Sequence, residues 1–380
     1  MTDPIDPVEL TQALVRRASV TPADDGAIPL LAERLEAAGF VVHRCDRNGI
    51  ANLFAKAGTG GPVFGFNGHT DVVPPGEPAD WTHPPFGAEI AEGRIWGRGA
   101  VDMKSGVAAF AAAAAAYRAE GGAGTVALLI TGDEEGESVD GTPAILDWMR
   151  ANGESLAHCL VGEPTCPERL GDMIKIGRRG SMTVKFTATG RQGHTAYPHR
   201  AANPLHPLMR LLDRLASRDL DRGTAHFDPS TLQITTVDVG NPASNVIPER
   251  ARATVNIRFN DAHTSKSLAL MLLQEAAAAS AGTGVTIETE FRVSGESFIT
   301  EPGRLSDIIS DAAEAETGLR PALSTTGGTS DARYVKAMCP VAEFGLVGQT
   351  MHQVDESAPV EEIRALARIY RGVLDRYFAA

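Results

Sequence analysis

The sequence predicts an α/β protein in which a mixed-sheet domain is interrupted by a smaller inserted domain with the element order βαββαβ. The chain has 380 residues, which is too long for one ordinary hydrophobic core. Short apolar runs such as Thr125–Ile130 alternate with helical patterns in its first part, as is typical of α/β domains. From about residue 181 the pattern changes to amphipathic strands and two helices in the order of a ferredoxin-like domain.

The larger domain is expected to consist of two segments, residues 1–179 and 295–380, on either side of an insertion at 180–294. Its first segment opens with a helical pattern over residues 8–39 that stops at Gly39. Apolar periodicity predicts its remaining strands at 41–44, 52–55, 62–66, 125–130 and 159–161, an alanine-rich helix ending near 120, and a helix at 143–151. The second segment has helices at 303–317 and 360–377 and a strand at 341–344.

The insertion alternates polar and apolar residues, as half-buried strands do. Its predicted strands are 181–189, 232–239, 253–259 and 285–292, and its predicted helices are 204–217 and 265–280.

The composition excludes several classes of protein. Hydrophobic residues make up 43% of the chain and charged residues 22%, as in soluble globular proteins. A net charge of −13 without clustered basic residues argues against a nucleic-acid partner. The N-terminus does not resemble a signal peptide, and the longest apolar run, 107–117, is too short to span a membrane. The four cysteines form no Cys-x-x-Cys pair, which predicts neither disulfides nor a thiolate zinc site, so we expect a cytoplasmic protein.

A group of carboxylates follows the apolar run 125–130 directly. Asp133, Glu134, Glu135 and Glu137 stand at the end of this predicted buried strand, which is where α/β sheets bind ligands. Like charges this close repel one another unless a cation, a shared proton or solvent relieves them. The turn is therefore either a solvated acidic surface or part of a cation site.

Other candidate ligands stand at comparable places in the chain. His69, Asp102 and Glu163 follow predicted strands or precede a helix, and His352 lies in the segment after the insertion. Together with Glu135 they suit a carboxylate-bridged pair of divalent ions. Imidazole combined with carboxylate favours zinc, with cobalt or manganese as substitutes.

Local context bears on two of these candidates. Asp71 shares a face with His69 on an extended backbone, so it can orient the imidazole. Asp102 stands at or just before the first turn of the alanine-rich helix, and its alternative role is an N-cap. The histidines expected to be ordinary core or surface residues are His43, His83, His158, His226 and His263.

The motifs around these residues resemble those of a known family. Gly68–Gly76 with Trp81–Phe86 looks like the first metal-binding block of the dinuclear zinc aminoacylase and carboxypeptidase family. Gly97–Gly106, Thr131–Gly136 and Gly162–Thr165 match its next three blocks. The resemblance covers residues 8 to 378 and makes the larger domain the catalytic, zinc-binding one.

The resemblance implies two Zn²⁺ per subunit, with Co²⁺ as a possible substitute in one or both sites. The implied ligands are His69 and Glu163 for one ion, Glu135 and His352 for the other, and Asp102 as the bridge. Glu134 would act as general base and acid in the hydrolysis of an amide bond, with Asp71 behind His69.

For the insertion, the resemblance implies a dimerisation and lid domain in a homodimer. His194 would reach the partner's active site and stabilise the oxyanion, and the substrate would be a small molecule with several carboxylates. The implied substrate-binding residues are Arg178, Ser181, Tyr197, Asn245, Arg258, Gly328 and Thr329. The role of Arg179 stays undecided, and Gly348 has no side chain where some family members carry a polar contact residue.

Three functions stay open at this point. Residues 177–181, 190–199, 244–248 and 327–333 favour a biosynthetic amidohydrolase whose substrate carries three carboxylates. Another amidase of the family, such as an acetylornithine deacetylase or a dipeptidase, would share the same five metal ligands. A non-catalytic zinc-binding scaffold is the third possibility, and the intact Glu134 beside the ligand set argues against it.

Overall fold

The computed structural model describes residues 5–379, which form two compact units. The larger unit comprises the chain up to Ile176, Thr300–Ser324 and the chain from Ser330 onward, and the smaller comprises Gly177–Ile299 and Thr325–Thr329. The chain leaves and re-enters the larger unit a few residues outside the expected limits, because β9 (Gly177–Arg178) pairs with β16 (Phe298–Ile299) in the smaller unit. The return of Thr325–Thr329 to the smaller unit was not predicted.

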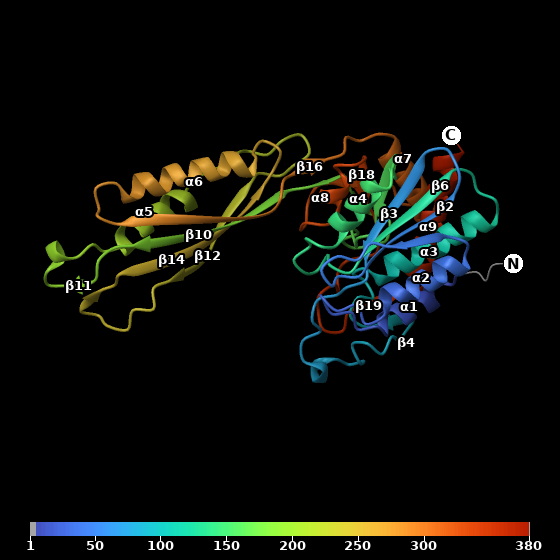
Figure 1. The fold of residues 1–380 in the computed structure, drawn as a ribbon, viewed down its shortest axis with the longest axis horizontal. Coiled ribbons are helices and arrows are strands. Elements are labelled where there is room, and N and C mark those ends of the chain that lie inside the picture. The colour runs from blue at the N-terminus through green and yellow to red at the C-terminus, as the bar shows by residue number, and fades with distance from the viewer. Residues whose placement is uncertain (1–4, 380) are drawn as a thin grey trace. The chain divides into compact units, whose positions relative to one another are not determined.

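An eight-stranded mixed sheet forms the centre of the larger unit, in the order β1-β2-β6-β3-β7-β18-β8-β17 (Figure 1). β3 runs parallel to both β6 and β7, whereas β2 is antiparallel to β1 and β6. This confirms the predicted α/β class with a mixed sheet. The strands are β1 (Val41–Arg44), β2 (Asn52–Gly58), β3 (Val63–His69), β6 (Thr125–Thr131), β7 (His158–Val161), β8 (Met173–Lys175), β17 (Ala322–Ser324) and β18 (Val341–Glu343).

The helices of this unit pack on the sheet through aromatic and small side chains. The ring of Phe66 on β3 stacks on that of Phe110 on α3, with centroids 4.3 Å apart, and both contact Tyr370 of α9 edge-on. α3 is buried along most of its length, because its alanines allow neighbouring helices to approach closely. The helices are α1 (Pro7–Val15), α2 (Ala27–Ala37), α3 (Lys104–Ala119), α4 (Thr142–Ala151), α7 (Arg304–Thr317), α8 (Ala332–Val335) and α9 (Val360–Phe378).

The expectation of one helical region over residues 8–39 was too simple, because two helices occur there. Residues 16–26 separate α1 from α2, and this loop is held by its own carboxylates. Asp24 accepts a hydrogen bond from the N–H of Ile28 at 2.9 Å, and Asp25 accepts one from the N–H of Ser19 at 2.9 Å. Residues 21–26 read Thr-Pro-Ala-Asp-Asp-Gly, a turn signal that divides the helical region and that the prediction of a single helical pattern overlooked.

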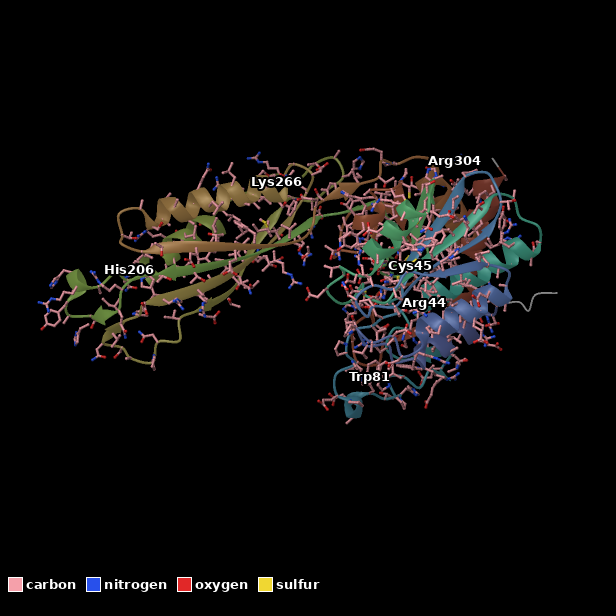
Figure 2. The ribbon with its side chains drawn as sticks, viewed as in Figure 1. Arg44, Cys45, Trp81, His206, Lys266 and Arg304 are labelled. Atoms are coloured by element: carbon pink, nitrogen blue, oxygen red, sulfur yellow. The ribbon has the colours of Figure 1, made fainter. Side chains whose placement is uncertain are left out.

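The smaller unit has the predicted order βαββαβ, in a four-stranded antiparallel sheet of order β12-β14-β10-β15. One face of the sheet packs on α5 and α6, which form its core with residues such as Phe186, Leu211 and Val255, while the other face carries polar side chains (Figures 1 and 2). The elements are β10 (Gly180–Thr189), α5 (Leu205–Ala216), β12 (Thr231–Asp238), β14 (Arg250–Phe259), α6 (Ser265–Ser280) and β15 (Thr286–Gly295).

Two short sheets hold loops that carry candidate site residues. β19 (Ser357–Pro359) pairs with β5 (Arg94–Trp96), which in turn pairs with β4 (Glu89–Ala91), so the segment before Ser357 is brought beside the segment after Trp96. In the smaller unit, β11 (Gly193–His194) pairs with β13 (Val246–Ile247). Two 3-10 helices, Pro78–Asp80 and Pro198–Arg200, complete the regular structure of the described residues. None of the helices within residues 5–379 is long and apolar enough to cross a membrane.

Candidate active site

The candidate ligands meet because neighbouring parallel strands end at the same edge of the larger sheet. β3 ends at His69, which lies opposite Thr131, the last residue of the adjacent strand β6. The acidic turn follows β6, and Glu163 follows β7 on the other side of β3. Parallel strands point their carboxyl ends to one side of a sheet, so these side chains converge.

Asp102 lies between two histidines that come from distant parts of the chain. Its Oδ1 is 3.2 Å from Nε2 of His69, and its Oδ2 is 3.3 Å from Nε2 of His352. Glu163 Oε1 lies 3.7 Å from His69 Nε2, and Glu135 Oε1 lies 2.9 Å from His352 Nε2. The two oxygens of one carboxylate thus face two separate imidazole–carboxylate pairs.

These donors fit a pair of divalent cations. The ligand atoms of His69, Asp102 and Glu163 lie within 4.8 Å of one another, and so do those of Asp102, Glu135 and His352. Among the described residues, these three carboxylates form ion pairs with the two histidines alone, so no arginine or lysine neutralises them. Imidazole nitrogen and carboxylate oxygen are the donors that zinc and related ions take in such sites.

The N-cap alternative for Asp102 is wrong. α3 is capped at Met103, and no side chain accepts a hydrogen bond from its first turn. The carboxylate of Asp102 is buried and turned to the two histidines instead.

The pKa values of the cluster reflect charged groups crowded together, most of them buried. Burial opposes protonation of His69, but its hydrogen bond with Asp102 and the neighbouring carboxylates raise the pKa of the imidazole well above its usual value. Hydrogen bonds with Asp102 and Glu135 raise the pKa of His352 to about 10. Burial, followed by the nearby carboxylates, raises the pKa values of Glu134 and Glu163.

The acidic turn is fixed by other carboxylates. The side chain of Asp71 accepts hydrogen bonds from the N–H groups of Glu134 and Glu135, at 3.2 and 3.0 Å. Asp133 accepts from the N–H groups of Val139 and Asp140, at 3.0 and 3.1 Å. Asp133 therefore holds the turn in shape, whereas Glu134 and Glu135 are left to face the cluster.

Asp71 acts on His69 differently from the prediction. The Nδ1–H of His69 donates to the main-chain carbonyl of Asp71 at 2.9 Å, while the Asp71 carboxylate lies 3.7 Å away. This contact leaves Nε2 for the cluster, so the orienting role belongs to the main chain. The side chain of Asp71 orients the acidic turn.

Sequence reasoning assigned no role to several buried groups around the cluster. Glu356 is fully buried, and its Oε1 accepts a hydrogen bond from the N–H of Asp102 at 3.1 Å. Asp331 is also buried, accepts a hydrogen bond from Thr142 at 2.7 Å, and its charge helps to raise the pKa of Glu134. The signal in the sequence was that both are acidic residues within motifs that resemble those of the family.

The predicted residues of the smaller unit fall into two groups. Ser181 is the direct partner of Arg258 in the β10–β14 ladder, and Arg178 donates to the carbonyl of Gly328 at 3.3 Å. Thr329 follows Gly328 in the segment that returns to this unit. Burial, followed by the positive charge of Arg179, lowers the pKa of Arg258. Because Arg178, Arg179 and Arg258 all lie at this end of the sheet, we call it the electropositive end.

The second group lies beyond the other end of β10. His194 pairs with Val246 next to Asn245, and the N–H of Thr195 donates to the carbonyl of Asn245 at 3.1 Å. The ring of Tyr197 lies 5.7 Å from that of His194, and its side chain is 51% exposed. From Ser181 to Thr189 an antiparallel strand covers about 27 Å. The two groups are therefore too far apart to contact one small ligand within this unit.

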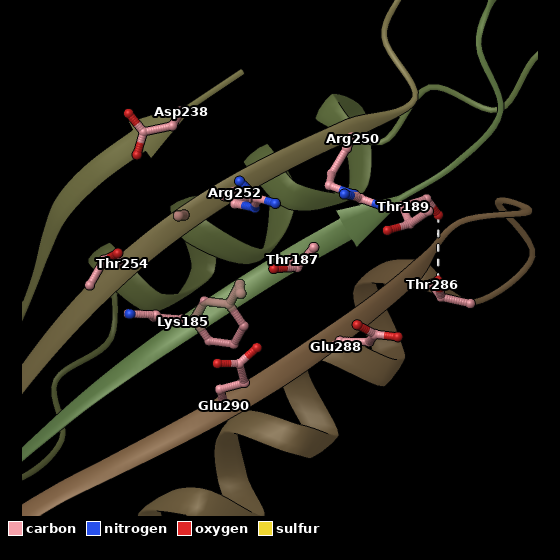
Figure 3. A pocket seen from close by; sticks show the side chains of 12 residues that line it. Lys185, Thr187, Thr189, Asp238, Arg250, Arg252, Thr254, Thr286, Glu288 and Glu290 are labelled. Atoms are coloured by element: carbon pink, nitrogen blue, oxygen red, sulfur yellow. Dashed lines mark hydrogen bonds between the residues drawn. The ribbon is translucent and has the colours of Figure 1, made fainter. Parts of the chain in front are cut away.

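A hollow of about 680 Å³ on the polar face of the four-stranded sheet does not resemble an active site (Figure 3). Four of its six charged residues form opposite-charge pairs across the strands: Lys185 faces Glu290, and Arg252 faces Asp238. Such cross-strand pairs are ordinary sheet stabilisation. None of the candidate metal ligands lies in this unit.

Comparisons with known proteins identify the family to which the chain belongs, and some of its similar structures bind metal. The family model described as Peptidase family M20/M25/M40 matches residues 65–376. Proteins named succinyl-diaminopimelate desuccinylase from Cereibacter sphaeroides and Paracoccus denitrificans are 63% and 62% identical to this chain, over 99% and 100% of it and over the whole of each relative.

Solved structures show the same fold at low sequence identity. A metallo-carboxypeptidase of the M20 family from Sulfolobus solfataricus has a TM-score of 0.79 at 16% identity, covering 99% of this chain and 100% of its own. A Bacillus subtilis protein described as a dinuclear metal-binding peptidase of the M20 family has a TM-score of 0.75 at 15% identity, covering 98% of both chains. The chain thus belongs to the peptidase family M20/M25/M40.

Proposed function

We propose that this protein hydrolyses N-succinyl-LL-2,6-diaminopimelate to succinate and LL-2,6-diaminopimelate, in the biosynthesis of lysine and cell-wall precursors. The observation that carries the proposal is identity of about 60% over the full length with proteins named succinyl-diaminopimelate desuccinylase. The cluster of imidazoles and carboxylates, which is buried at His69, Asp102 and Glu163 and open at His352, supports it, because amide hydrolysis by a metal-activated water needs such a donor set.

The cluster would hold two Zn²⁺, with Co²⁺ as a possible substitute. The residues that would hold them are His69 and Glu163, Glu135 and His352, and Asp102 between the two pairs. When bound, the ions supply Lewis acidity that lowers the pKa of a water molecule and polarises the amide carbonyl.

Glu134 is the proposed general base and acid. It takes a proton from the attacking water as the water oxygen bonds to the amide carbon, and it gives that proton to the amine nitrogen as the C–N bond breaks. Its main chain is fixed by Asp71, and its own carboxylate accepts no hydrogen bond from the described residues. A carboxylate beside two dications stays ionised near neutral pH, as a base must.

The electropositive end of the smaller sheet is the proposed binding region for the substrate carboxylates. Arg178 and Arg258 are the proposed bidentate partners, since guanidinium groups match carboxylates in shape and charge. Ser181, Gly328 and Thr329 would add hydrogen bonds, and all five lie together in the smaller unit.

His194, with Tyr197 and Asn245, is proposed to act on the active site of a second copy in a homodimer. The N–H of Ala196 donates to Nδ1 of His194 at 3.0 Å, which places the ring proton on Nε2. An imidazole in this tautomer is a hydrogen-bond donor of the kind that a tetrahedral oxyanion requires. The distance along β10 supports a second copy, because one chain cannot bring both groups of this unit to one substrate.

We further propose a cytoplasmic protein without nucleic-acid or membrane partners, on the grounds of its charge and its biosynthetic role. The test of the function is succinate release from N-succinyl-LL-2,6-diaminopimelate by the zinc-loaded protein, with and without a chelator. We expect turnover that the chelator abolishes. Faster turnover of N-acetylornithine or of a dipeptide would assign another activity of the family, and two bound zinc ions without any hydrolysis would indicate a scaffold.

A further inference from the structure

A buried ion pair joins the two segments that carry Asp102 and His352. Arg98 is 2% exposed and Glu356 is fully buried, and Nη1 of the arginine lies 2.6 Å from Oε2 of the glutamate. Neither residue belongs to the proposed ligand set or contacts Glu134 in the described residues.

On one side, Glu356 holds the main chain that leads into Asp102. Its Oε1 accepts hydrogen bonds from the N–H groups of Val101 and Asp102, at 2.8 and 3.1 Å. Its own carbonyl accepts from the N–H of Gly97 at 2.8 Å. One carboxylate oxygen therefore fixes the backbone of the proposed bridging ligand, although Glu356 lies 254 residues away in the sequence.

On the other side, Arg98 holds the loop that carries His352. Its guanidinium donates to the carbonyl of Gln353 at 3.1 Å and to that of His352 at 3.4 Å. Its Cζ lies 5.3 Å from the centre of the Trp81 ring, which covers it; Trp81 is labelled in Figure 2. His352 has φ of 62°, a left-handed conformation that non-glycine residues keep only when their surroundings enforce it.

Together, the contacts of Arg98 and Glu356 connect the main chain at Asp102 to the main chain at His352, and both residues are proposed ligands of the same metal position. A buried ion pair contributes little to folding on balance, because desolvation of the two charges offsets their attraction. Its geometry points to another role, since most of the other hydrogen bonds of the two side chains go to the main chain of the segments that carry Asp102 and His352. One longer hydrogen bond of Arg98 goes to the carbonyl of Pro74, at 3.5 Å. His69 is held separately, by the carbonyl of Asp71.

We propose that Arg98 and Glu356 are positioning residues that set the distance between Asp102 and His352. They thereby determine the metal affinity of the position formed by Asp102, Glu135 and His352, more than that of the position formed by His69, Asp102 and Glu163. This inference rests on the ligand assignment in the proposed function.

The test uses a double variant in which the pair is removed without leaving an unpaired buried charge, Arg98→Met with Glu356→Met. The metal-free protein is titrated with Zn²⁺ against a competing chelator, and with Co²⁺ followed by its visible absorption. A His352→Ala variant identifies which of the two metal equivalents belongs to the His352 position. Thermal melting of the metal-free proteins reports their folding.

We expect the double variant to melt near the wild-type temperature and to bind the His352-position metal about 10- to 100-fold more weakly. The affinity for the other equivalent should change less than threefold or so, and the Co²⁺ spectrum should change at the His352 position. Single Glu356→Gln should weaken the same equivalent. Asp355→Asn is the matched control, because Asp355 is the residue next to Glu356. The carboxylate of Asp355 accepts hydrogen bonds from Thr82, which is not beside a proposed ligand in the chain, so metal binding should stay normal.

Unchanged affinity of both equivalents in the double variant would overturn the inference, and so would an equal loss of both. If the double variant does not fold, the same readouts on Glu356→Gln decide. These outcomes differ from failure of the proposed function, in which the wild-type protein itself would bind no pair of metals or release no succinate.

Discussion

The region around His69 in the larger unit and the region around His194 in the smaller unit differ in how their polar groups are held. In the larger unit, His69 is 1% exposed, and almost every polar group around it has a partner within the same chain. In the smaller unit, His194 and Tyr197 are exposed, and within residues 5–379 the imidazole of His194 is held by the N–H of Ala196 and by a ring contact with Tyr197. In the proposed shared site, the first region acts within its own chain, whereas His194 and Tyr197 act on a second copy.

Removal of Glu134 should have the largest effect, because it takes away the proton carrier and leaves the buried ligands in place. Glu134→Ala should lower kcat by about 10²–10⁴-fold while both metal equivalents still bind. Steady-state kinetics and metal content on the same preparation check this. Near-normal turnover would show that the base has been assigned to the wrong carboxylate, and loss of metal would show that Glu134 is a ligand.

Substitution of the exposed His194 should act on chemistry alone. His194→Ala should lower kcat by about 10²–10³-fold, the cost of one oxyanion donor, with metal content and melting temperature unchanged. Kinetics with the succinylated substrate measure this. His206→Ala, at an exposed position of the same unit, is a suitable control. An unchanged kcat would remove the donor role and weaken the contrast between the two regions.

The electropositive end of the smaller sheet should affect binding more than turnover. Arg178→Ala or Arg258→Ala should raise KM by about 10- to 100-fold, because a charge-assisted hydrogen bond contributes about 1.5–3 kcal/mol. Arg250→Ala is the matched control, since Arg250 lies on the same strand and the same face, at its other end. Equal effects of Arg258→Ala and Arg250→Ala would mean that substrate binding is not confined to one end.

Metal binding in the larger unit should release protons. The pKa of His352 is raised to about 10 by its hydrogen bonds with Asp102 and Glu135, so without metal the imidazole is protonated at pH 7. A metal takes only the neutral ring, so binding displaces this proton, and affinity should rise about tenfold per pH unit and per proton below the raised pKa. Calorimetry in buffers of different ionisation enthalpy measures the protons. No release at pH 7 would contradict the assignment of the histidines as ligands.

The sequence was informative where chemistry follows directly from strand ends. His69, the acidic turn and Glu163 each follow an apolar run, and parallel pairing alone is enough to bring them together. Asp102 and His352 could be placed only by their motifs, because no local pattern shows that β19 pairs with β5 and brings their segments together.

Other features could not be predicted from local patterns. The orienting contact to His69 comes from a main-chain carbonyl, and a sequence does not separate main-chain from side-chain partners. Arg98 and Glu356 are 258 positions apart in the sequence, so no local pattern shows that they are in contact. Each lies in a motif whose other residues were already assigned as metal ligands, so neither drew attention by itself. The return of Thr325–Thr329 to the smaller unit has no periodic signal, because it contains neither helix nor strand.

The most direct measurement of the central claim is a mixing experiment with two inactive variants. The Glu134→Ala variant lacks the proposed base, which lies in the larger unit. The His194→Ala variant lacks the proposed oxyanion donor, which lies in the smaller unit. When the two are mixed under conditions that exchange subunits, half of the dimers carry both variants, and each of these has one intact site. With a shared site, the mixture should recover about a quarter of the wild-type activity. No recovery, with subunit exchange demonstrated, would show that each chain supplies its own histidine and would contradict a shared site.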